Sequence, residues 1–163
     1  MTAEYLERCR TAAAESPGAT PDWDPPPEDL LDTDWAIWGL IHHCRATHAA
    51  GDLIALLDRA VSGDPGADIG FLDHAEVYDG FDGPPQLLTT TAVAAVAHAL
   101  ASVDLDGVLS DLPPTTEEAA AACGFGPGFN GDVRAYLTHH FAAMREFYDG
   151  AARQGRCMVV WTD

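Results

Sequence analysis

The chain has 163 residues and a formal net charge of −18 at pH 7, because 26 aspartates and glutamates are balanced by only 8 basic residues. All eight are arginines, and no lysine occurs. Proteins that bind nucleic acids or anionic membranes draw affinity from clustered lysine and arginine, so this composition excludes both partners. It would attract a basic protein partner, because opposite charges accelerate association at low salt, although the simpler interpretation is that an acidic surface keeps the protein soluble.

The length and the hydrophobic fraction of 47% predict one folded domain that spans residues 1–163. No apolar run approaches the roughly 20 residues that a membrane-spanning helix needs. The first eight residues also lack the hydrophobic core of a signal peptide. We therefore expect a cytoplasmic protein.

Four cysteines are widely spaced and include no Cys-x-x-Cys pair. Zinc sites and redox motifs use such pairs, so we expect no metal and no other cofactor at these positions. Thiols of this kind in a cytoplasmic protein are typically reduced and buried. The four residues are Cys9, Cys44, Cys123 and Cys157.

The beginning of the chain divides into a helix and a linker. Residues 1–15 are expected to hold a short helix from Thr2 to Ala14, because apolar side chains recur on one helical face. Five prolines between positions 17 and 27 predict an extended linker over residues 16–28. Residues 29–163 are then expected to form the core.

The first strong helix is predicted from Asp32 to Ala50, with Asp32 as its N-cap and Gly51 as its stop. A shorter helix is predicted from Leu53 to Val61. The helical spacing of the longer segment predicts an apolar face that packs inward. That face is expected to consist of Trp35, Trp38, Ile41 and Cys44, with Ile37 and Leu40 beside them.

Short elements are expected in the middle of the chain. Thr89 is a good N-cap residue, and Thr115-x-x-Glu118 has the pattern of a capping box. Alternating apolar residues between glycines and prolines predict short strands. The expected strands lie near Ile69–Leu72, Glu76–Tyr78 and Gln86–Leu88; helical segments follow from Thr89 to Ser102, from Asp104 to Leu112 and from Thr115 to Gly124.

Residues 124–131 form a glycine-rich segment with the sequence Gly-Phe-Gly-Pro-Gly-Phe-Asn-Gly. Phosphate-binding loops of this kind carry a lysine at a fixed spacing and follow a strand. This segment has no lysine, and no strand is predicted before it. We therefore expect a flexible connector rather than a phosphate site.

The strongest helical pattern runs from Asp132 to Gln154, and Gly155 is expected to close it. A buried strand from Cys157 to Trp161 is predicted next. Together the patterns predict an α+β fold: a mainly helical single domain with a small sheet of short strands, a long C-terminal helix and a final strand. The apolar stripe of the long helix comprises Val133, Tyr136, Leu137, Phe141, Met144, Phe147, Tyr148 and Ala151.

Three motifs in order resemble a known family. The first is Leu31-Asp-Thr-Asp34 before a tryptophan-rich helix that contains Gly39-Leu40. The second is Leu88-Thr89-x-x-x-Val93-x-x-Val96-Ala97-x-Ala-Leu100, and the third is Phe147-Tyr148-x-x-Ala151-Ala152-x-x-Gly155 before an apolar strand. This order resembles the YfbM-like family of small bacterial proteins, a domain of unknown function. The resemblance covers most of the chain from Leu31 and implies a compact α+β fold with no established activity.

The chain departs from this family in two places. Family members begin with a strand, whereas residues 1–15 are predicted to be helical here. The family's Trp-His-Gly-Leu/Ile-His reads Ile37-Trp38-Gly39-Leu40-Ile41, so both of those histidines are absent. Without the first strand, the strand from Cys157 to Trp161 is expected to lack a neighbour. Its edge is then covered either by residues 1–14 or by a second copy of the chain, as a homodimer.

Histidines occur as neighbouring pairs on two predicted helices, His42-His43 and His139-His140. Neighbours on a helix point about 100° apart, so neither pair chelates a metal by itself. One histidine from each helix with an acid such as Asp34 could bind a metal. The simpler interpretation places these histidines in solvent or at the edges of buried faces, and we assign no metal ligand and no catalytic residue.

Aromatic residues are concentrated on elements that are expected to meet. Most should lie in the core, but a cleft with aromatic walls and a histidine at its rim would bind a small organic molecule. The candidate ligand-binding residues are Trp35, Trp38, His42, His139 and Tyr148.

Three functions stay open from the sequence. The favoured one is a non-catalytic cytoplasmic binding or accessory protein with an acidic surface, such as an immunity protein that neutralises a basic toxin. The second is a small-molecule binder, or an enzyme of a secondary pathway, that uses an aromatic cleft with histidine. The third is a metal-dependent enzyme that uses the histidines.

Overall fold

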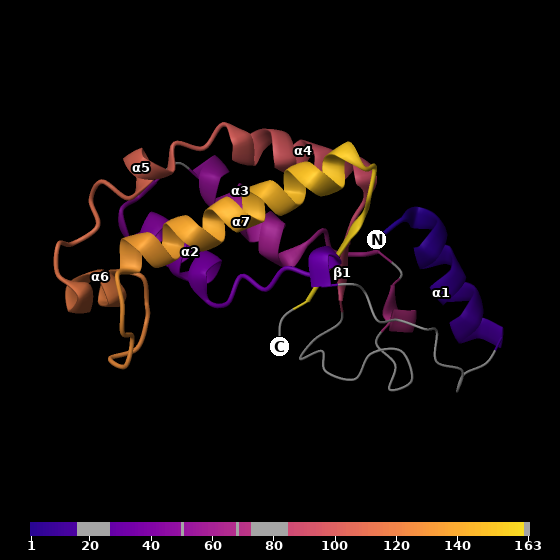
Figure 1. Ribbon diagram of the computed structural model, residues 1–163, viewed down its shortest axis with the longest axis horizontal. Helices are drawn as coiled ribbons and strands as arrows, with labels where there is room; N and C mark the ends of the chain where they lie inside the picture. Colours follow the sequence, from indigo (N-terminus) through magenta and orange to yellow (C-terminus); the bar gives the residue numbers. More distant parts are fainter. Residues whose placement is uncertain (16–26, 50, 68, 73–84, 162–163) are drawn as a thin grey trace.

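The computed structural model describes residues 1–15, 27–49, 51–67, 69–72 and 85–161. Within these residues the chain is mostly helical, with a small antiparallel sheet, and a long helix precedes the last strand (Figure 1). This confirms the predicted fold class. The α-helices are α1 (Ala3–Glu15), α2 (Ala36–Ala46), α3 (Gly51–Ser62), α4 (Thr90–Ala101), α5 (Leu105–Val108), α6 (Thr116–Ala122) and α7 (Val133–Arg153); the strands are β1 (Gln86–Leu88) and β2 (Met158–Val160).

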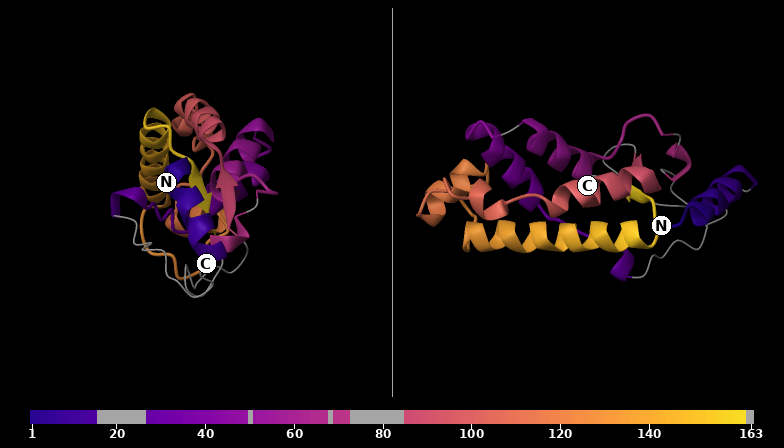
Figure 2. Two further views of the ribbon diagram at one scale, coloured as in Figure 1. Left: turned by 90° about the vertical axis from the view of Figure 1, so that its right-hand side faces the viewer. Right: turned by 90° about the horizontal axis from the view of Figure 1, so that it is seen from above.

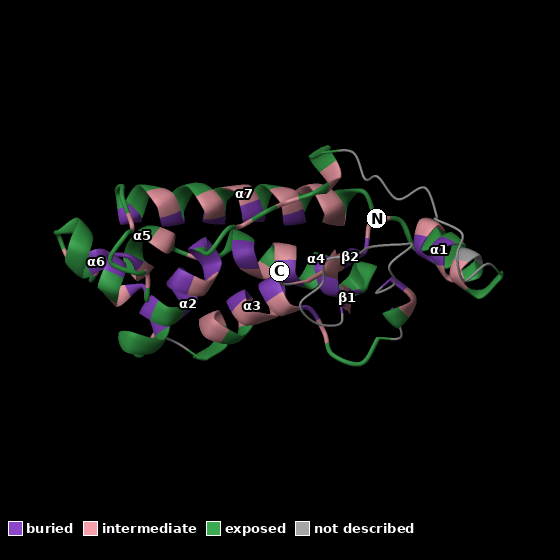
Figure 3. Ribbon diagram, turned by 90° about the horizontal axis from the view of Figure 1, so that it is seen from below, coloured by how far each residue is buried: buried purple, intermediate pink, exposed green. Residues whose placement is uncertain are grey.

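Helix α7 is the centre of the arrangement. Helix α4 lies along it, α2 packs against it and α3 packs against both α2 and α4. The sheet and α1 lie at one end of the molecule, and α5 and α6 lie at the other (Figures 1 and 2). The buried faces of α2, α4 and α7 point toward one another (Figure 3), and their side chains form one hydrophobic cluster.

The long helix α7 forms as the sequence predicts. The Asp132 carboxylate accepts a hydrogen bond from the Ala135 N–H at 3.0 Å and so caps the first turn. Gly155 adopts a φ of 60° after the helix, a conformation that favours glycine. Five side chains of the predicted stripe are buried: Val133, Leu137, Phe141, Met144 and Tyr148.

The predicted bounds of α2 were wrong at both ends. Asp32 does not cap the helix, because its Oδ1 accepts a hydrogen bond at 2.6 Å from the N–H of Asp34, which adopts a left-handed φ of 48°. The helix therefore begins only at Ala36. It ends at Ala46 because His48 adopts a φ of 55° and the Ala49 N–H donates back to the Cys44 carbonyl. Gly51 does not stop α2 but begins α3.

The predicted inward face of α2 also needs correction. Positions 37, 40, 41 and 44 are buried, whereas Trp35 is 66% exposed and Trp38 is half-buried. At 100° per residue, Trp35 lies opposite Ile37, whereas Trp38 lies between Trp35 and the buried face. Trp38 therefore still packs partly against the core, and Trp35 is left for another role.

Local capping signals were reliable elsewhere. The hydroxyl of Thr89 accepts from the Ala92 N–H and begins α4, as predicted. The hydroxyl of Thr115 accepts from the Glu118 N–H at 3.3 Å and donates to the Glu118 carboxylate at 2.7 Å. The predicted helical turn after Asp104 appears as α5. Each of these elements begins at the residue that the sequence signal indicates.

The strands were predicted in part. β1 and β2 pair in antiparallel register, with Leu88 opposite Met158. The strand predicted at Ile69–Leu72 was wrong, because Gly70–Leu72 forms a 3₁₀ turn in which the Leu72 N–H bonds the Ile69 carbonyl. The strand predicted at Glu76–Tyr78 and the linker up to residue 26 lie outside the described residues. Pro27–Asp29 forms another 3₁₀ turn.

The N-terminal segment contacts the residue directly before β2. The Cys157 N–H donates to the Met1 carbonyl at 3.0 Å, and the Met1 amine donates to the Cys157 carbonyl at 3.1 Å. Helix α1 buries Leu6 and Cys9 in a small cluster with Cys157 and the 3₁₀ turn at Gly70–Leu72. The strand itself pairs with β1, so the expectation that it lacks a neighbour was wrong. The N-terminal segment covers only the residue before it, and the homodimer stays a prediction.

All four cysteines are free and buried, as predicted. Among the described residues, none of the helices combines the length and the apolar character that crossing a bilayer requires.

Candidate functional site

A cleft of about 570 Å³ lies where the start of α2, the glycine-rich segment after α6 and the start of α7 meet. This is the end of the molecule opposite α1 (Figure 1). Aromatic side chains from all three segments line the cleft. They are Trp35 and Trp38 from the α2 side, Phe125 and Phe129 from the glycine-rich segment, and Tyr136 from α7.

The α2 side of the cleft follows from the helical period. Trp35, Trp38 and His42 are three and four residues apart, so they share a face. Trp35 and His42 on that face are exposed, and Trp38 lies between them and the core, so the face can line a cleft. Both tryptophans were predicted as core residues, and their position at the cleft is the consequence of that corrected face.

The glycine-rich segment builds a wall of the cleft. Gly124 follows α6 with a φ of 72°, and the Phe125 N–H bonds back to the Ala120 carbonyl at 2.9 Å. This turn directs the Phe125 ring onto α2 at Gly39, where an added Cβ would lie only 2.3 Å from the ring. Phe125 then stacks on Phe129 with ring centroids 4.9 Å apart. The interpretation as a simple connector missed this role, although the two phenylalanines between glycines were a signal.

Tyr136 joins the aromatic wall to an acid. Its ring is edge-on to Phe125 and Phe129, at centroid distances of 5.6 and 5.3 Å. Its hydroxyl donates a hydrogen bond of 2.9 Å to Oδ2 of Asp34. Burial, together with this bond, raises the pKa of Tyr136 to about 12. The phenol therefore stays protonated, and stays a donor, at neutral pH.

Asp34 is held at the rim by its backbone. Its φ of 48° is in the left-handed region, which aspartate adopts more readily than most residues. The hydrogen bond from its N–H to Asp32 Oδ1 fixes the turn. Asp32 was predicted to cap α2, and Asp34 was considered as an acid that could join two histidines at a metal. Instead, the turn places the Asp34 carboxylate beside Tyr136, and the sequence pattern alone gave no sign of this partner.

His42 lies at the rim with an exposed side chain. Its Nδ1 is 3.1 Å from the carbonyl oxygen of Ala122. A carbonyl only accepts, so Nδ1 carries the hydrogen in this contact. The ring also lies against Gly124, where an added Cβ would come within 3.2 Å of it. His42 thus helps to attach the end of α6 to α2.

Two of the five candidate residues lie elsewhere. Tyr148 is 3% exposed in the core, and its hydroxyl donates to the Ala60 carbonyl at 2.8 Å. It is twelve residues, or about 18 Å along the helix, from Tyr136. His139 is exposed on α7 and contacts His140, whose ring is edge-on to Tyr136 at 4.7 Å. The structure therefore brings together Trp35, Trp38 and His42 but not the other two.

The histidines do not form a ligand set in the described part of the chain. His43 is 1% exposed, and its Nε2 is 3.3 Å from the carbonyl of Val108. No group of three His, Cys, Asp or Glu side chains within the described ranges is arranged to hold a metal ion.

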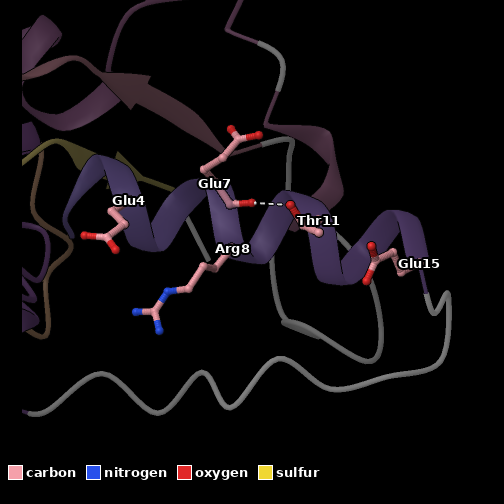
Figure 4. Close-up of a pocket in the computed structure, with 5 residues that line it drawn as sticks. All are labelled: Glu4, Glu7, Arg8, Thr11 and Glu15. Carbon is pink, nitrogen blue, oxygen red and sulfur yellow. Dashed lines mark hydrogen bonds between the residues drawn. The ribbon is translucent and has the colours of Figure 1, made fainter.

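A second hollow follows the outer face of α1 (Figure 4). Among the described residues, its lining consists of exposed side chains of that helix: Glu4, Glu7, Arg8, Thr11 and Glu15. The Thr11 hydroxyl donates to the Glu7 carbonyl of its own helix at 3.0 Å. The described polar groups here all come from one helix face and do not converge on a ligand position.

Comparison with known proteins places the chain in a family. No match was found among curated proteins or among solved structures. The family described as a domain of unknown function (DUF1877) matches residues 4–161. The matched range begins in helix α1 and ends at the last described residue. Because the match covers nearly the whole chain, the protein belongs to the DUF1877 family.

Proposed function

We propose that this protein is a non-catalytic binding protein and that the aromatic cleft is its ligand site. The observation that carries the proposal is the 66% exposure of Trp35 in a cleft that four other aromatic side chains line. Exposed apolar surface at a concave site is typical of binding sites. Trp35 also contributes nothing to the core that would account for its place.

The chemistry of the lining supports binding rather than catalysis. A catalytic nucleophile needs a neighbouring base or a lowered pKa. Burial instead raises the pKa of the Cys123 thiol to about 11, which disfavours the reactive thiolate. The Tyr136 hydroxyl and the Asp34 carboxylate bond each other, and the His42 Nδ1 bonds a backbone carbonyl. These groups fix the shape of the cleft.

The size of the cleft supports a small organic ligand. Small-molecule sites in proteins have volumes of roughly 300–1,000 Å³ and combine apolar walls with a few polar groups. The volume of about 570 Å³ is within that range. The polar groups here include the Asp34 carboxylate, the Tyr136 hydroxyl and the His42 imidazole, which would orient a ligand between the aromatic walls.

A basic protein partner is the second candidate, and the net charge of −18 favours it. An immunity protein that neutralises a basic toxin is one form of this function. Exposed tryptophans are also frequent anchors at protein interfaces. The YfbM-like resemblance is consistent with the family match, and we retain it, with a bacterial origin and a cytoplasmic location, as part of this proposal.

The test is ligand binding by the protein and by Trp35→Ala. A panel of small aromatic, heterocyclic and amine compounds would be screened by thermal shift and then measured by calorimetry. We expect at least one ligand whose affinity falls tenfold or more in Trp35→Ala, while the melting temperature without ligand is unchanged.

Leu30→Ala is the matched control. Leu30 is the other large apolar side chain that is exposed in the described residues, at 45%, and it does not line the cleft. Equal effects of the two substitutions on every ligand would contradict the proposal. Salt-sensitive binding of a basic protein that Trp35→Ala leaves unchanged would instead support the second candidate at another surface.

A further inference from the structure

The charges at the cleft restrict the class of ligand. Among the described residues that line it there is one carboxylate, that of Asp34, and no arginine. The raised pKa values of Tyr136 and Cys123 keep both groups uncharged at neutral pH. The whole chain carries a formal charge of −18. The local and the overall charge therefore both oppose an anionic ligand and favour a cation.

The aromatic walls have the same preference. The faces of aromatic rings carry partial negative charge and attract ammonium and guanidinium groups, with tryptophan the strongest of them. Trp35 and Trp38 line the cleft from the start of α2, and Phe129 and Tyr136 line it from the glycine-rich segment and from α7. A cation bound between these walls would lose contacts with water and gain contacts with the aromatic ring faces and with one carboxylate.

Asp34 is prepared to act as the counter-ion. Its Oδ2 accepts from the Tyr136 hydroxyl, and a carboxylate has about four acceptor positions, so capacity remains for N–H groups of a ligand. Its backbone is fixed by the left-handed turn and by the bond to Asp32. A charge that is already in place costs less ordering on binding than a mobile one.

We infer that the cleft binds an organic cation, a guanidinium or an alkylated ammonium group, between its aromatic walls with Asp34 as the counter-ion. The inference rests on the proposed function and specifies its ligand. A neutral aromatic ligand would cover the carboxylate without pairing it, which costs free energy.

The experiment compares two cations with uncharged molecules of nearly the same shape. The first pair is choline and 3,3-dimethyl-1-butanol; the second is N-acetylarginine amide and N-acetylcitrulline amide. Binding would be measured by calorimetry and tryptophan fluorescence at pH 7 and low salt. We expect each protein–cation affinity to exceed that of its neutral counterpart by tenfold or more. Tighter binding of choline would indicate a free ammonium compound as the ligand, and tighter binding of N-acetylarginine amide would indicate the arginine side chain of a protein.

The variants separate local from overall charge. Asp34→Asn keeps the acceptor for Tyr136 and tolerates the left-handed turn, since asparagine also adopts it. We expect it to weaken cation binding about tenfold and to leave the weak binding of the neutral compounds unchanged. Glu146→Gln, on an exposed position of α7 outside the cleft, removes the same charge and should have no effect.

The outcomes distinguish this inference from the proposed function. If neutral compounds bind as tightly as the cations and Trp35→Ala abolishes that binding, the inference of a cationic ligand is wrong. The proposal that the cleft is a binding site then still holds. Equal losses in Asp34→Asn and Glu146→Gln would overturn the role of Asp34. If no cation binds more tightly than its neutral counterpart and Trp35→Ala changes no ligand, both conclusions fail.

Discussion

Tyr136 and Tyr148 are on the same helix, and both donate a hydrogen bond through the hydroxyl, but their surroundings differ. Tyr136 bonds an exposed carboxylate at the rim of a cleft, and Tyr148 bonds a backbone carbonyl within the core. Burial raises the pKa of both phenols above the ordinary value. One helix is therefore the wall of a candidate site at its beginning and part of the core further along.

The apolar stripe of α7 does not distinguish these two ends. It continues through both tyrosines with the same spacing. The difference comes from the neighbouring elements. Tyr148 bonds Ala60 of α3 within the core cluster. Tyr136 is bordered by the turn at Asp34 and by the glycine-rich segment. The packing partners of a stripe, rather than the stripe, decide where a cleft remains.

The largest effect is expected for Phe141→Ala, between the two tyrosines. Phe141 is 2% exposed and belongs to the core cluster, so the substitution should lower the free energy of unfolding by about 3–5 kcal/mol. Urea unfolding would measure it. Phe147→Ala, at a half-buried position of the same helix, is the control and should cost less. An unchanged midpoint for Phe141→Ala would show that this face of α7 is not the core.

Tyr148→Phe tests the buried tyrosine. The substitution leaves the Ala60 carbonyl without its donor in the core, which should lower the free energy of unfolding by about 1–3 kcal/mol. Chemical denaturation at pH 7 would measure this. A loss no larger than that of Tyr136→Phe would mean that the two hydrogen bonds are equivalent and that the comparison has no energetic basis.

Gly39→Ala tests the contact that shapes the cleft. The added Cβ would overlap the Phe125 ring, so the ring must move away from α2, at a cost of about 1–2 kcal/mol. We expect ligand binding to fall more than stability does. Gly150→Ala, in α7 and outside the cleft, is the control, because an added Cβ there meets no atom within 4 Å. Equal binding by the two variants would show that the position of Phe125 is unimportant.

Tyr136→Phe should have the smallest effect at pH 7, about 0.5 kcal/mol, because water replaces the exposed hydrogen bond. The substitution should also change how the free energy of unfolding depends on pH. The pKa of Tyr136 is raised to about 12 from an ordinary value of 10, so its contribution is present below pH 10 and is lost between pH 10 and 12. Tyr148 is present both in the unsubstituted protein and in Tyr136→Phe, so its contribution cancels in the difference between the two stability curves. Parallel stability curves over that range would contradict the assignment.

Sequence patterns predicted the elements whose signals are local. The caps at Thr89 and Thr115 and the stripe of α7 depend on residues within a few positions, and they were confirmed. The start of α2 was wrong because Asp32 can serve either as a helix cap or in a turn with Asp34, and the sequence does not decide between them.

The site was predicted less completely than the fold. Trp35, Trp38 and His42 were selected for aromatic character near a histidine, and the structure places all three at the cleft, although the tryptophans were also assigned to the inward face of α2. Phe125 and Tyr136 could not be connected with them from the sequence. That connection depends on the gap at Gly39 and on a hydrogen bond between residues 34 and 136, which only the packing of α2, α6 and α7 creates.

The pairing of β1 with β2 has a consequence for how the protein opens. Leu88 pairs with Met158 about 70 residues later. Closing a loop of that length costs chain entropy, and a three-residue ladder supplies few hydrogen bonds to offset this cost. Cys157, directly before that ladder, also holds Met1 and the cluster beneath α1. We therefore expect the strands and α1 to open together as one cooperative unit, with faster amide hydrogen exchange than the helices around α7.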